Sequence, residues 1–383
     1  MKIVSIEPTP SPHSMKINLD EELPDGKNLN YKQSDNLQEA PAYIRQLFTI
    51  DGVKNIYQVT DFIALARSPK HTWEAILPEV RKALGTVETE DTTDHPYHWE
   101  SEVDDAFGEV KVFVQMFREI PMQVKLENGD GEQRFGLTEV FSNAVMEASA
   151  ASPNFIMERK WIEQHPRYGA IQEIGNDVVE ELSASYGKER LAILVGQAFE
   201  ETLTTESKIP QKKMVTLETL NEPDWKVRYA ALDQLDPTYT DLPLLDKALS
   251  DEKASIRRLA TAYLGMIEEP EVLPYLYKAL KDKAVNVRRT AGDCISDLGF
   301  KEAMPEMIQS LSDKNRLVRW RAAMFLYEVG DESAIPALED AADEPEFEVR
   351  MQINMALERI KKGEDARGSV WHQMTQAVIN KKD

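Results

Sequence analysis

One pattern returns five times in the second half of the chain, and it limits the folds open to that half more than any other feature. Each copy contains a valine or isoleucine followed by arginine, and successive copies start 29, 31, 31 and 31 residues apart, at Val227, Ile256, Val287, Val318 and Val349. A proline recurs with a period of 31 residues, at Pro243, Pro274, Pro305 and Pro336. Periods of 20–50 residues are typical of solenoids, in which each repeat packs on its neighbours.

The columns of this repeat have helical spacing. Four residues after the valine or isoleucine the first four copies have alanine, and eight residues after it every copy has leucine or isoleucine. Residues at i, i+4 and i+8 share one face of a helix, and alanine lets neighbouring helices approach closely. Each proline fits the first turn of a preceding helix, where its missing N–H costs nothing. The pattern therefore predicts an all-α solenoid over residues 213–362, followed by a polar cap or tail over 363–383.

Three repeats have an aspartate five residues before the valine or isoleucine, at Asp251, Asp282 and Asp313. We expect each aspartate to cap the second helix of its repeat and to pair with the arginine column. This recurring pattern resembles the short HEAT repeats of bilin-lyase-like proteins. The resemblance implies an inner surface that binds a protein, and a structural ladder of aspartate–arginine pairs in which the arginines are Arg228, Arg257, Arg288, Arg319 and Arg350.

A second set of arginines follows the ladder column. Arg258 and Arg289 come one residue after it, and Arg321 comes two residues after it. We predict that these three line the inner surface of the solenoid and form the candidate interaction surface for a partner protein, with a solvated helix face as the alternative. Cys294 falls in a packing column of the repeat, which predicts a buried thiol that acts as a small hydrophobic residue.

Residues 1–87 predict a small α+β domain. Apolar residues alternate on both sides of the proline-rich EPTPSP loop, as they do in strands, and two further strands are expected at 53–59 and 62–66. Helical stripes follow Pro41 and Trp73, so the predicted order is ββαββα.

Four features of this segment carry a resemblance. They are the EPTPSP loop with Lys16 after it, the stretch 47–53, the Asp61-Phe62-Ile63 strand start, and Trp73 at the opening of the last helix. Together they are similar to the N-terminal domain of NifU-like (Nfu) iron–sulfur scaffold proteins. In those proteins a CxxC motif in a separate C-terminal domain holds the cluster, and this chain has one cysteine. Cluster binding is therefore not carried over, and no cofactor is predicted.

Residues 95–205 predict an α/β middle domain whose fold the pattern does not name, joined to the first domain by the acidic linker VETEDTTD. The turn sequence Asn128-Gly129-Asp130-Gly131 indicates a hairpin, and Thr138 is the expected N-cap of a helix. The predicted strands are 110–114, 122–126, 133–137 and 155–162, and the predicted helices are 138–151, 171–186 and 188–201.

A short stretch of the middle domain has the composition of a metal site. A turn on an acidic surface explains this stretch as well, so no metal site is predicted. The residues concerned are His95, His98, Glu100, Asp104 and Asp105. The chain also lacks the phosphate-loop, dinucleotide, zinc-protease and serine-hydrolase motifs, and no catalytic residues are assigned.

Composition limits the partners and the compartment. The formal charge is 45 − 67 = −22, which opposes non-specific binding to nucleic acid or anionic lipid. One cysteine excludes an intrachain disulfide and any CxxC site. No apolar run reaches the roughly 18 residues of a membrane span, and the N-terminus has no signal-peptide shape. We therefore expect a cytoplasmic protein with protein partners, and leave its oligomeric state open.

The predicted fold class is multidomain, with an α+β N-terminal domain, an α/β middle domain and an all-α HEAT-like solenoid. This order resembles the conserved virulence factor C family of Firmicutes over the full length, which implies an effect on virulence traits such as haemolysin production in pathogenic members. Two interaction modules and no catalytic set favour a non-enzymatic adaptor. The alternatives are an accessory protein of iron–sulfur cluster assembly or delivery, and an enzyme of the bilin lyase or DNA glycosylase type.

Overall fold

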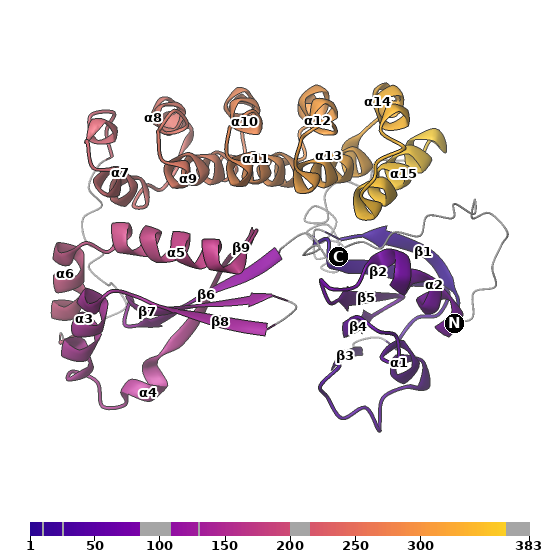
Figure 1. Ribbon diagram of the computed structural model, residues 1–383, viewed down its shortest axis with the longest axis horizontal. Helices are drawn as coiled ribbons and strands as arrows, with labels where there is room; N and C mark the ends of the chain where they lie inside the picture. Colours follow the sequence, from indigo (N-terminus) through magenta and orange to yellow (C-terminus); the bar gives the residue numbers. More distant parts are fainter. Residues whose placement is uncertain (10, 25–26, 85–108, 129–130, 200–214, 365–383) are drawn as a thin grey trace, which may run out of the picture. The chain divides into compact units, whose positions relative to one another are not determined.

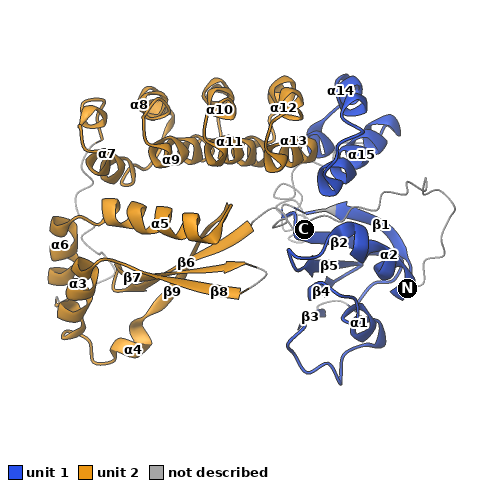
Figure 2. Ribbon diagram, viewed as in Figure 1, with its two compact units in different colours: residues 1–107, 326–383 blue, residues 108–325 orange. Residues whose placement is uncertain are grey.

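The computed structural model describes residues 1–9, 11–24, 27–84, 109–128, 131–199 and 215–364 (Figure 1). The chain divides into two compact units (Figure 2): unit 1 combines residues 1–107 with 326–383, and unit 2 is residues 108–325. The division falls inside one helix of the repeat region, α13 (Arg316–Val329). The predicted fold class is confirmed, with α+β regions followed by a helix-rich repeat region.

Unit 1 contains a five-stranded antiparallel sheet in the order β1-β2-β5-β4-β3. The predicted order ββαββα lacked β3, and the described order is βββαββα. β3 is an edge strand with no fully buried residue, so its short alternation of Leu29 and Tyr31 was too weak to identify it. The elements are β1 (Ile3–Pro8), β2 (Ser14–Leu19), β3 (Asn28–Lys32), α1 (Ala42–Leu47), β4 (Val53–Val59), β5 (Phe62–Arg67) and α2 (Trp73–Ala83).

The core of this region joins the sheet to its helices. Buried residues alternate along β2, and the ring of Trp73 is fully buried where α2 begins. The indole Nε1 of Trp73 donates to the carbonyl oxygen of Pro12 at 2.9 Å. Because a buried indole N–H needs an acceptor, this bond ties the proline-rich loop to α2.

Two helices of the repeat region also belong to unit 1, α14 (Ile335–Asp340) and α15 (Phe347–Lys361). Phe347 and Met351 of α15 pack against the core of the α+β region. Arg67 Nη2 donates to Glu348 Oε1 at 3.0 Å, and both side chains are nearly buried. The last described repeat therefore provides a packing surface for the N-terminal region.

We expect His13 to make unit 1 sensitive to acid. Both of its ring nitrogens are buried without a hydrogen-bond partner among the described residues. Burial and the nearby charge of Arg67 lower the pKa of His13 to about 3, from 6.5 in an unfolded chain. Since the unfolded state then binds more protons between pH 6.5 and 3, stability should fall as the pH falls through this range, by about 2 kcal/mol at pH 5.

The measurement is the thermal unfolding midpoint of the full chain between pH 7.5 and 5. The variant His13→Gln has no proton to bind at this position, so its midpoint should change less over the same range. Equal changes in the two proteins would show that another group is responsible.

Unit 2 begins with a four-stranded antiparallel sheet in the order β8-β7-β6-β9. The predicted strand at 155–162 is wrong in its first half, because Asn154 caps a short helix there by accepting from the Met157 N–H at 3.3 Å. Thr138 is at the N-cap of α3, but its side chain makes no capping hydrogen bond. The elements are β6 (Glu109–Phe117), β7 (Ile120–Asn128), β8 (Gly131–Gly136), α3 (Glu139–Ser149), α4 (Phe155–Glu158), β9 (Lys160–Tyr168), α5 (Ile171–Ser185) and α6 (Lys188–Ala198).

Helix α5 covers one face of this sheet (Figure 1). Ile174 and Val178 pack on the buried side chains of β6 and β7. Gly175 lies between them on the helix, and a Cβ atom there would lie 2.2 Å from the ring of Phe135 on β8. The close approach of α5 to the sheet therefore requires a glycine at this position.

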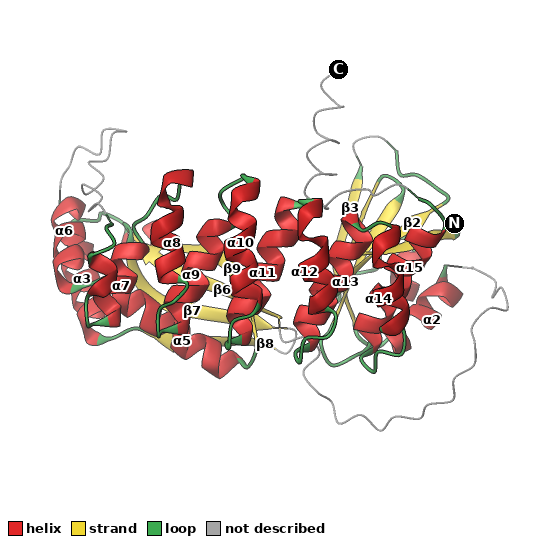
Figure 3. Ribbon diagram, turned by 90° about the horizontal axis from the view of Figure 1, so that it is seen from above, coloured by secondary structure: helices red, strands yellow, loops and turns green. Residues whose placement is uncertain are grey.

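The repeats follow as pairs of helices (Figure 3). Within unit 2, α7, α9 and α11 form one row and α8, α10 and α12 form the other (Figure 1). The prolines occupy the first turn of α8, α10, α12 and α14, as predicted. The helices are α7 (Trp225–Leu232), α8 (Leu242–Ala248), α9 (Ala254–Leu264), α10 (Leu273–Leu280), α11 (Val285–Leu298) and α12 (Met304–Ser310), with short 3-10 turns at Thr219–Asn221, Tyr239–Asp241, Pro270–Val272, Lys301–Ala303 and Glu332–Ala334.

The helix columns are buried as predicted, except in the first repeat. Ile256, Val287, Val318 and Val349 are at most 2% exposed, whereas Val227 is 46% exposed. The first repeat has no preceding repeat to cover this column, so its valine faces solvent.

Candidate interaction face of the solenoid

The predicted ladder of aspartate–arginine pairs is present in unit 2. The guanidinium of each arginine binds both carboxylate oxygens of the aspartate in the next repeat, a geometry that suits the two planar groups. The bonds are Arg228 to Asp251 at 2.7 and 2.9 Å, Arg257 to Asp282 at 2.6 and 2.9 Å, and Arg288 to Asp313 at 2.7 and 3.0 Å.

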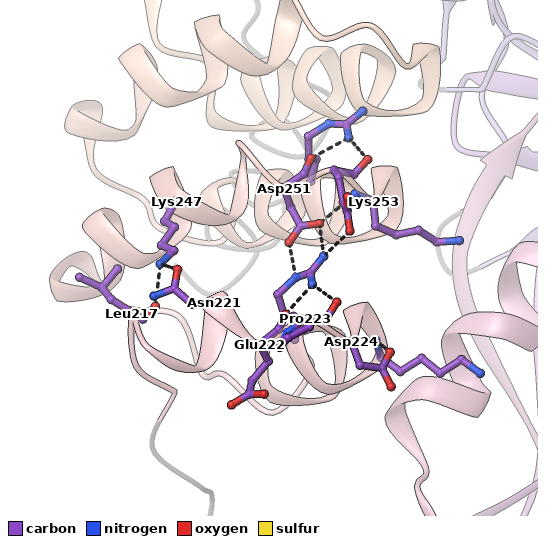
Figure 4. Close-up of polar contacts among 12 residues, drawn as sticks. Leu217, Asn221, Glu222, Pro223, Asp224, Lys247, Asp251 and Lys253 are labelled. Atoms are coloured by element: carbon purple, nitrogen blue, oxygen red, sulfur yellow. Dashed lines mark hydrogen bonds and ion pairs between the residues drawn. The ribbon is translucent and has the colours of Figure 1, made fainter.

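Each rung of the ladder also fixes the turns around it. Arg228 Nη1 donates to the carbonyl oxygens of Glu222 and Pro223 at 2.6 and 3.0 Å (Figure 4). Asp251 accepts from the Lys253 N–H at 2.8 Å, where the second helix of the next repeat begins. Since these donors and acceptors are satisfied within the chain, the interpretation of Arg228, Arg257 and Arg288 as framework is confirmed.

Arg258, in the second arginine set, contacts the middle region of the chain. Its Nη2 atom donates to both carboxylate oxygens of Glu181 on α5, at 3.1 and 3.2 Å. Arg167 on β9 donates to the same carboxylate, with Nη1 at 3.2 Å from Oε1. The side chain of Glu181 is 7% exposed, so one buried carboxylate joins two arginines from different parts of unit 2.

Arg289 and Arg321 are buried as well. Arg289 stacks over the ring of Tyr168 with a centroid distance of 4.4 Å and donates to the carbonyl oxygen of Leu317 at 3.2 Å. Arg321 Nε lies 2.7 Å from Asp293 Oδ1. The alternative of a solvated helix face is therefore wrong for all three arginines, and their role toward a separate partner protein stays a prediction.

The electrostatics of Glu181 favour its ionised form. Burial opposes ionisation, but the charges of Arg258 and Arg167 and their hydrogen bonds outweigh it and lower the pKa of Glu181 to about 2. The same arrangement raises the pKa of the buried Tyr229 on α7, through burial first and through the charge of Glu181 second. Glu181 is thus a fixed negative charge against the row of α7 and α9.

Sequence reasoning did not identify Glu181 or Tyr168. Both lie outside the repeats, and neither belongs to a motif. The available signal for Glu181 was its place in an amphipathic helix, where an acidic pair, Glu180-Glu181, follows an apolar stripe.

Cys294 is a buried thiol in the structure, as predicted. It is 9% exposed, and its Sγ atom lies 3.5 Å from the carbonyl oxygen of Thr261. Burial raises the pKa of the thiol above its usual range, with Asp293 and Asp297 contributing. Since the thiolate is the reactive form, we expect Cys294 to react with a maleimide about 100-fold more slowly in the folded protein than in urea.

The control for this labelling is Ser312→Cys, which adds a thiol at an exposed turn. That variant should take up one equivalent rapidly and the second only after unfolding. Rapid labelling of the wild-type protein under native conditions would contradict the buried assignment.

In the described parts of the chain, no group of three histidine, cysteine or acidic residues is arranged to hold a metal ion. One stretch for which no metal site was predicted lies outside the described residues, namely the one with His95, His98, Glu100, Asp104 and Asp105. None of the described helices has the length and apolar character needed to cross a membrane.

Three family models match the chain. The model described as scaffold protein Nfu/NifU N terminal matches residues 4–90, and the one described as virulence factor matches residues 115–195. The HEAT repeats model matches residues 214–292 and 276–358. The predicted Nfu-type N-terminal domain and HEAT repeats are thereby confirmed.

Full-length relatives and a solved structure are also similar. The uncharacterized protein YpgR of Bacillus subtilis is 59% identical over 98% of this chain and 99% of its own length. Conserved virulence factor C of Staphylococcus aureus (strain NCTC 8325) is 49% identical over 99% of this chain and all of its own length. The crystal structure of protein SAV1430 from Staphylococcus aureus is 37% identical over 22% of this chain and 98% of that one, with a TM-score of 0.20.

Proposed function

The chain belongs to the conserved virulence factor C family, and from this premise we propose that it is a non-enzymatic adaptor that holds a partner protein on its HEAT-repeat region. The main support is the ladder, because Arg228, Arg257 and Arg288 stiffen consecutive repeats without occupying the rest of their surface. A stiffened stack of repeats is the kind of extended surface that solenoids use to bind other proteins.

We assign the candidate interaction surface to the helix row that carries Arg258, Arg289 and Arg321, which a partner reaches by displacing the contacts that bury them, with residues 213–362 as the repeat domain. The Nfu-like domain at 1–87 is a second module for another protein, and 95–205 is the middle domain between them. The name of the staphylococcal relatives supports a cellular role in virulence traits, of which haemolysin production is the expected one.

The test is a quantitative pull-down from a native cell extract with the full-length chain as bait. The wild-type bait should retain a stoichiometric protein, and the triple variant Arg258→Gln/Arg289→Gln/Arg321→Gln should lose it. The matched control is Lys278→Gln/Lys281→Gln/Lys301→Gln, which removes the same charge from exposed positions of the repeats and should retain the partner. Circular dichroism establishes that each bait is folded.

The adaptor proposal fails if the wild-type bait retains nothing above background. The assignment of its surface fails if the triple variant and the lysine control retain the same protein equally. If the triple variant does not fold, Arg258→Lys, which keeps the charge but not the paired geometry, should weaken retention instead.

A further inference from the structure

Helix α5 contacts both the sheet and the repeats. Ile174 and Val178 pack in the core of the sheet, and Glu181, Ala184 and Ser185 are buried further along the helix. There Arg258 of α9 binds Glu181, and Tyr229 of α7 is 4% exposed. A helix from outside the repeats thus lies on the row of repeat helices where a solenoid would receive a ligand.

The charges across this contact are complementary. The repeats contribute Lys253 and Arg258, and α5 contributes Glu180 and Glu181. Lys253 Nζ lies 2.9 Å from Glu180 Oε2. The two adjacent glutamates of α5 are therefore each paired with a basic side chain of the repeats. Because Arg258 is largely buried, whatever covers it must carry a negative charge or leave a cation unpaired.

The side chains that follow Glu181 on α5 also limit which helix can lie on this face of the repeats. After Glu181 the next positions on the same face, three and four residues on, are Ala184 and Ser185, and both are buried. Small side chains one turn after the glutamate let the helix backbone come close to α7. At the end of this contact the charges are reversed, because the cation, Arg190, is on α6 and the anion, Asp233, is in the repeats, 3.4 Å away. The acidic stretch that faces the repeats is therefore limited to the length of α5.

We propose that the face formed by α7 and α9 is a binding site for an acidic amphipathic helix, and that α5 is its occupant within the chain. A partner protein then presents a helix of the same chemistry, with a glutamate followed one turn later by two small residues, and competes with α5 for Arg258. This inference rests on the proposed adaptor function and names the class of partner segment it takes.

The probe is a peptide of residues 170–187, acetylated, amidated and labelled with fluorescein. Its binding to full-length protein is measured by fluorescence anisotropy. In the wild-type protein the chain's own α5 competes at high effective concentration, so binding should be weak. The full-length variant Glu181→Gln weakens that competitor and should bind the peptide about ten-fold more tightly or better.

Two matched controls test the chemistry. The peptide carrying Glu181→Gln should bind the variant protein at least about ten-fold more weakly, because it cannot pair with Arg258. The double variant Glu181→Gln/Arg258→Gln should lose binding of the unchanged peptide by a similar factor. Equal affinity of both peptides, or no effect of Arg258→Gln, overturns the proposal.

If Glu181→Gln does not fold by circular dichroism, the variant Asp177→Asn/Glu180→Gln replaces it, since both side chains are at exposed positions. The same order of affinities is expected, and its absence counts against the proposal. The two proposals can fail separately. A partner that is retained by the Glu181→Gln bait but not displaced from it by the peptide removes the acidic-helix site and leaves the adaptor. Peptide binding without any retained partner leaves the acidic-helix site and removes the adaptor.

Discussion

Replacing Glu181 by alanine is expected to lower the free energy of unfolding by about 3–5 kcal/mol. The carboxylate is bound by Arg258 and Arg167, and its side chain is 7% exposed. Without it two arginines remain close together in a largely buried place, and neither keeps a carboxylate that it binds directly, with Asp177 as the remaining nearby negative charge. The cost of the substitution is therefore the cost of uncompensated charge, and it exceeds the value of the ion pairs themselves.

The measurement is urea unfolding of the full-length protein at pH 7. The control is Glu180→Ala on the same helix, which removes a single pair with Lys253 at a side chain that is 54% exposed, and which should cost less than about 1 kcal/mol. Similar losses for the two variants would mean that Glu181 does not act as a buried hub.

The pH dependence gives a second check on Glu181. Its pKa is lowered to about 2 in the folded protein, so its contribution is present above the ordinary glutamate range and is lost as the pH falls toward 2. Wild-type protein should therefore lose more stability than Glu181→Ala between pH 5 and 3.

Removing one rung of the ladder is the second large effect. Asp282→Ala leaves the guanidinium of Arg257, which is 4% exposed, with only backbone carbonyls as partners. Burial opposes ionisation of Asp282, but its hydrogen bonds to Arg257 and to the Ala284 N–H outweigh it and lower the pKa of Asp282. We expect a loss of about 3 kcal/mol in the free energy of unfolding.

The same urea titration measures this loss. Asp246→Ala, which removes a pair with Lys278 between side chains that are 48% and 46% exposed, should cost less than about 0.5 kcal/mol. The double variant Asp282→Ala/Arg257→Met should recover part of the loss, because no buried charge then remains. A single variant as stable as wild type would mean that the ladder does not stiffen the repeats.

Much of the repeat region could be predicted from its spacing. A fixed period places the same side chain at the same position of every repeat, so Arg257 and Asp282 must meet if the repeats stack at all. The N-terminal sheet was predicted except for β3, whose five residues have no fully buried member. In the middle region the short helix α4 was missed, because a single turn capped by Asn154 has no periodicity to detect.

The candidate site was also only partly predictable from the sequence. By itself the sequence determined that Arg258, Arg289 and Arg321 lie beside the ladder, because helical geometry assigns positions within a repeat. Only the tertiary structure decided what covers them. Arg258 and Glu181 are 77 residues apart, and Glu181 has no periodic counterpart. The packing of α5 against both the sheet and the repeats, with Gly175 close to Phe135, brings the two charges together.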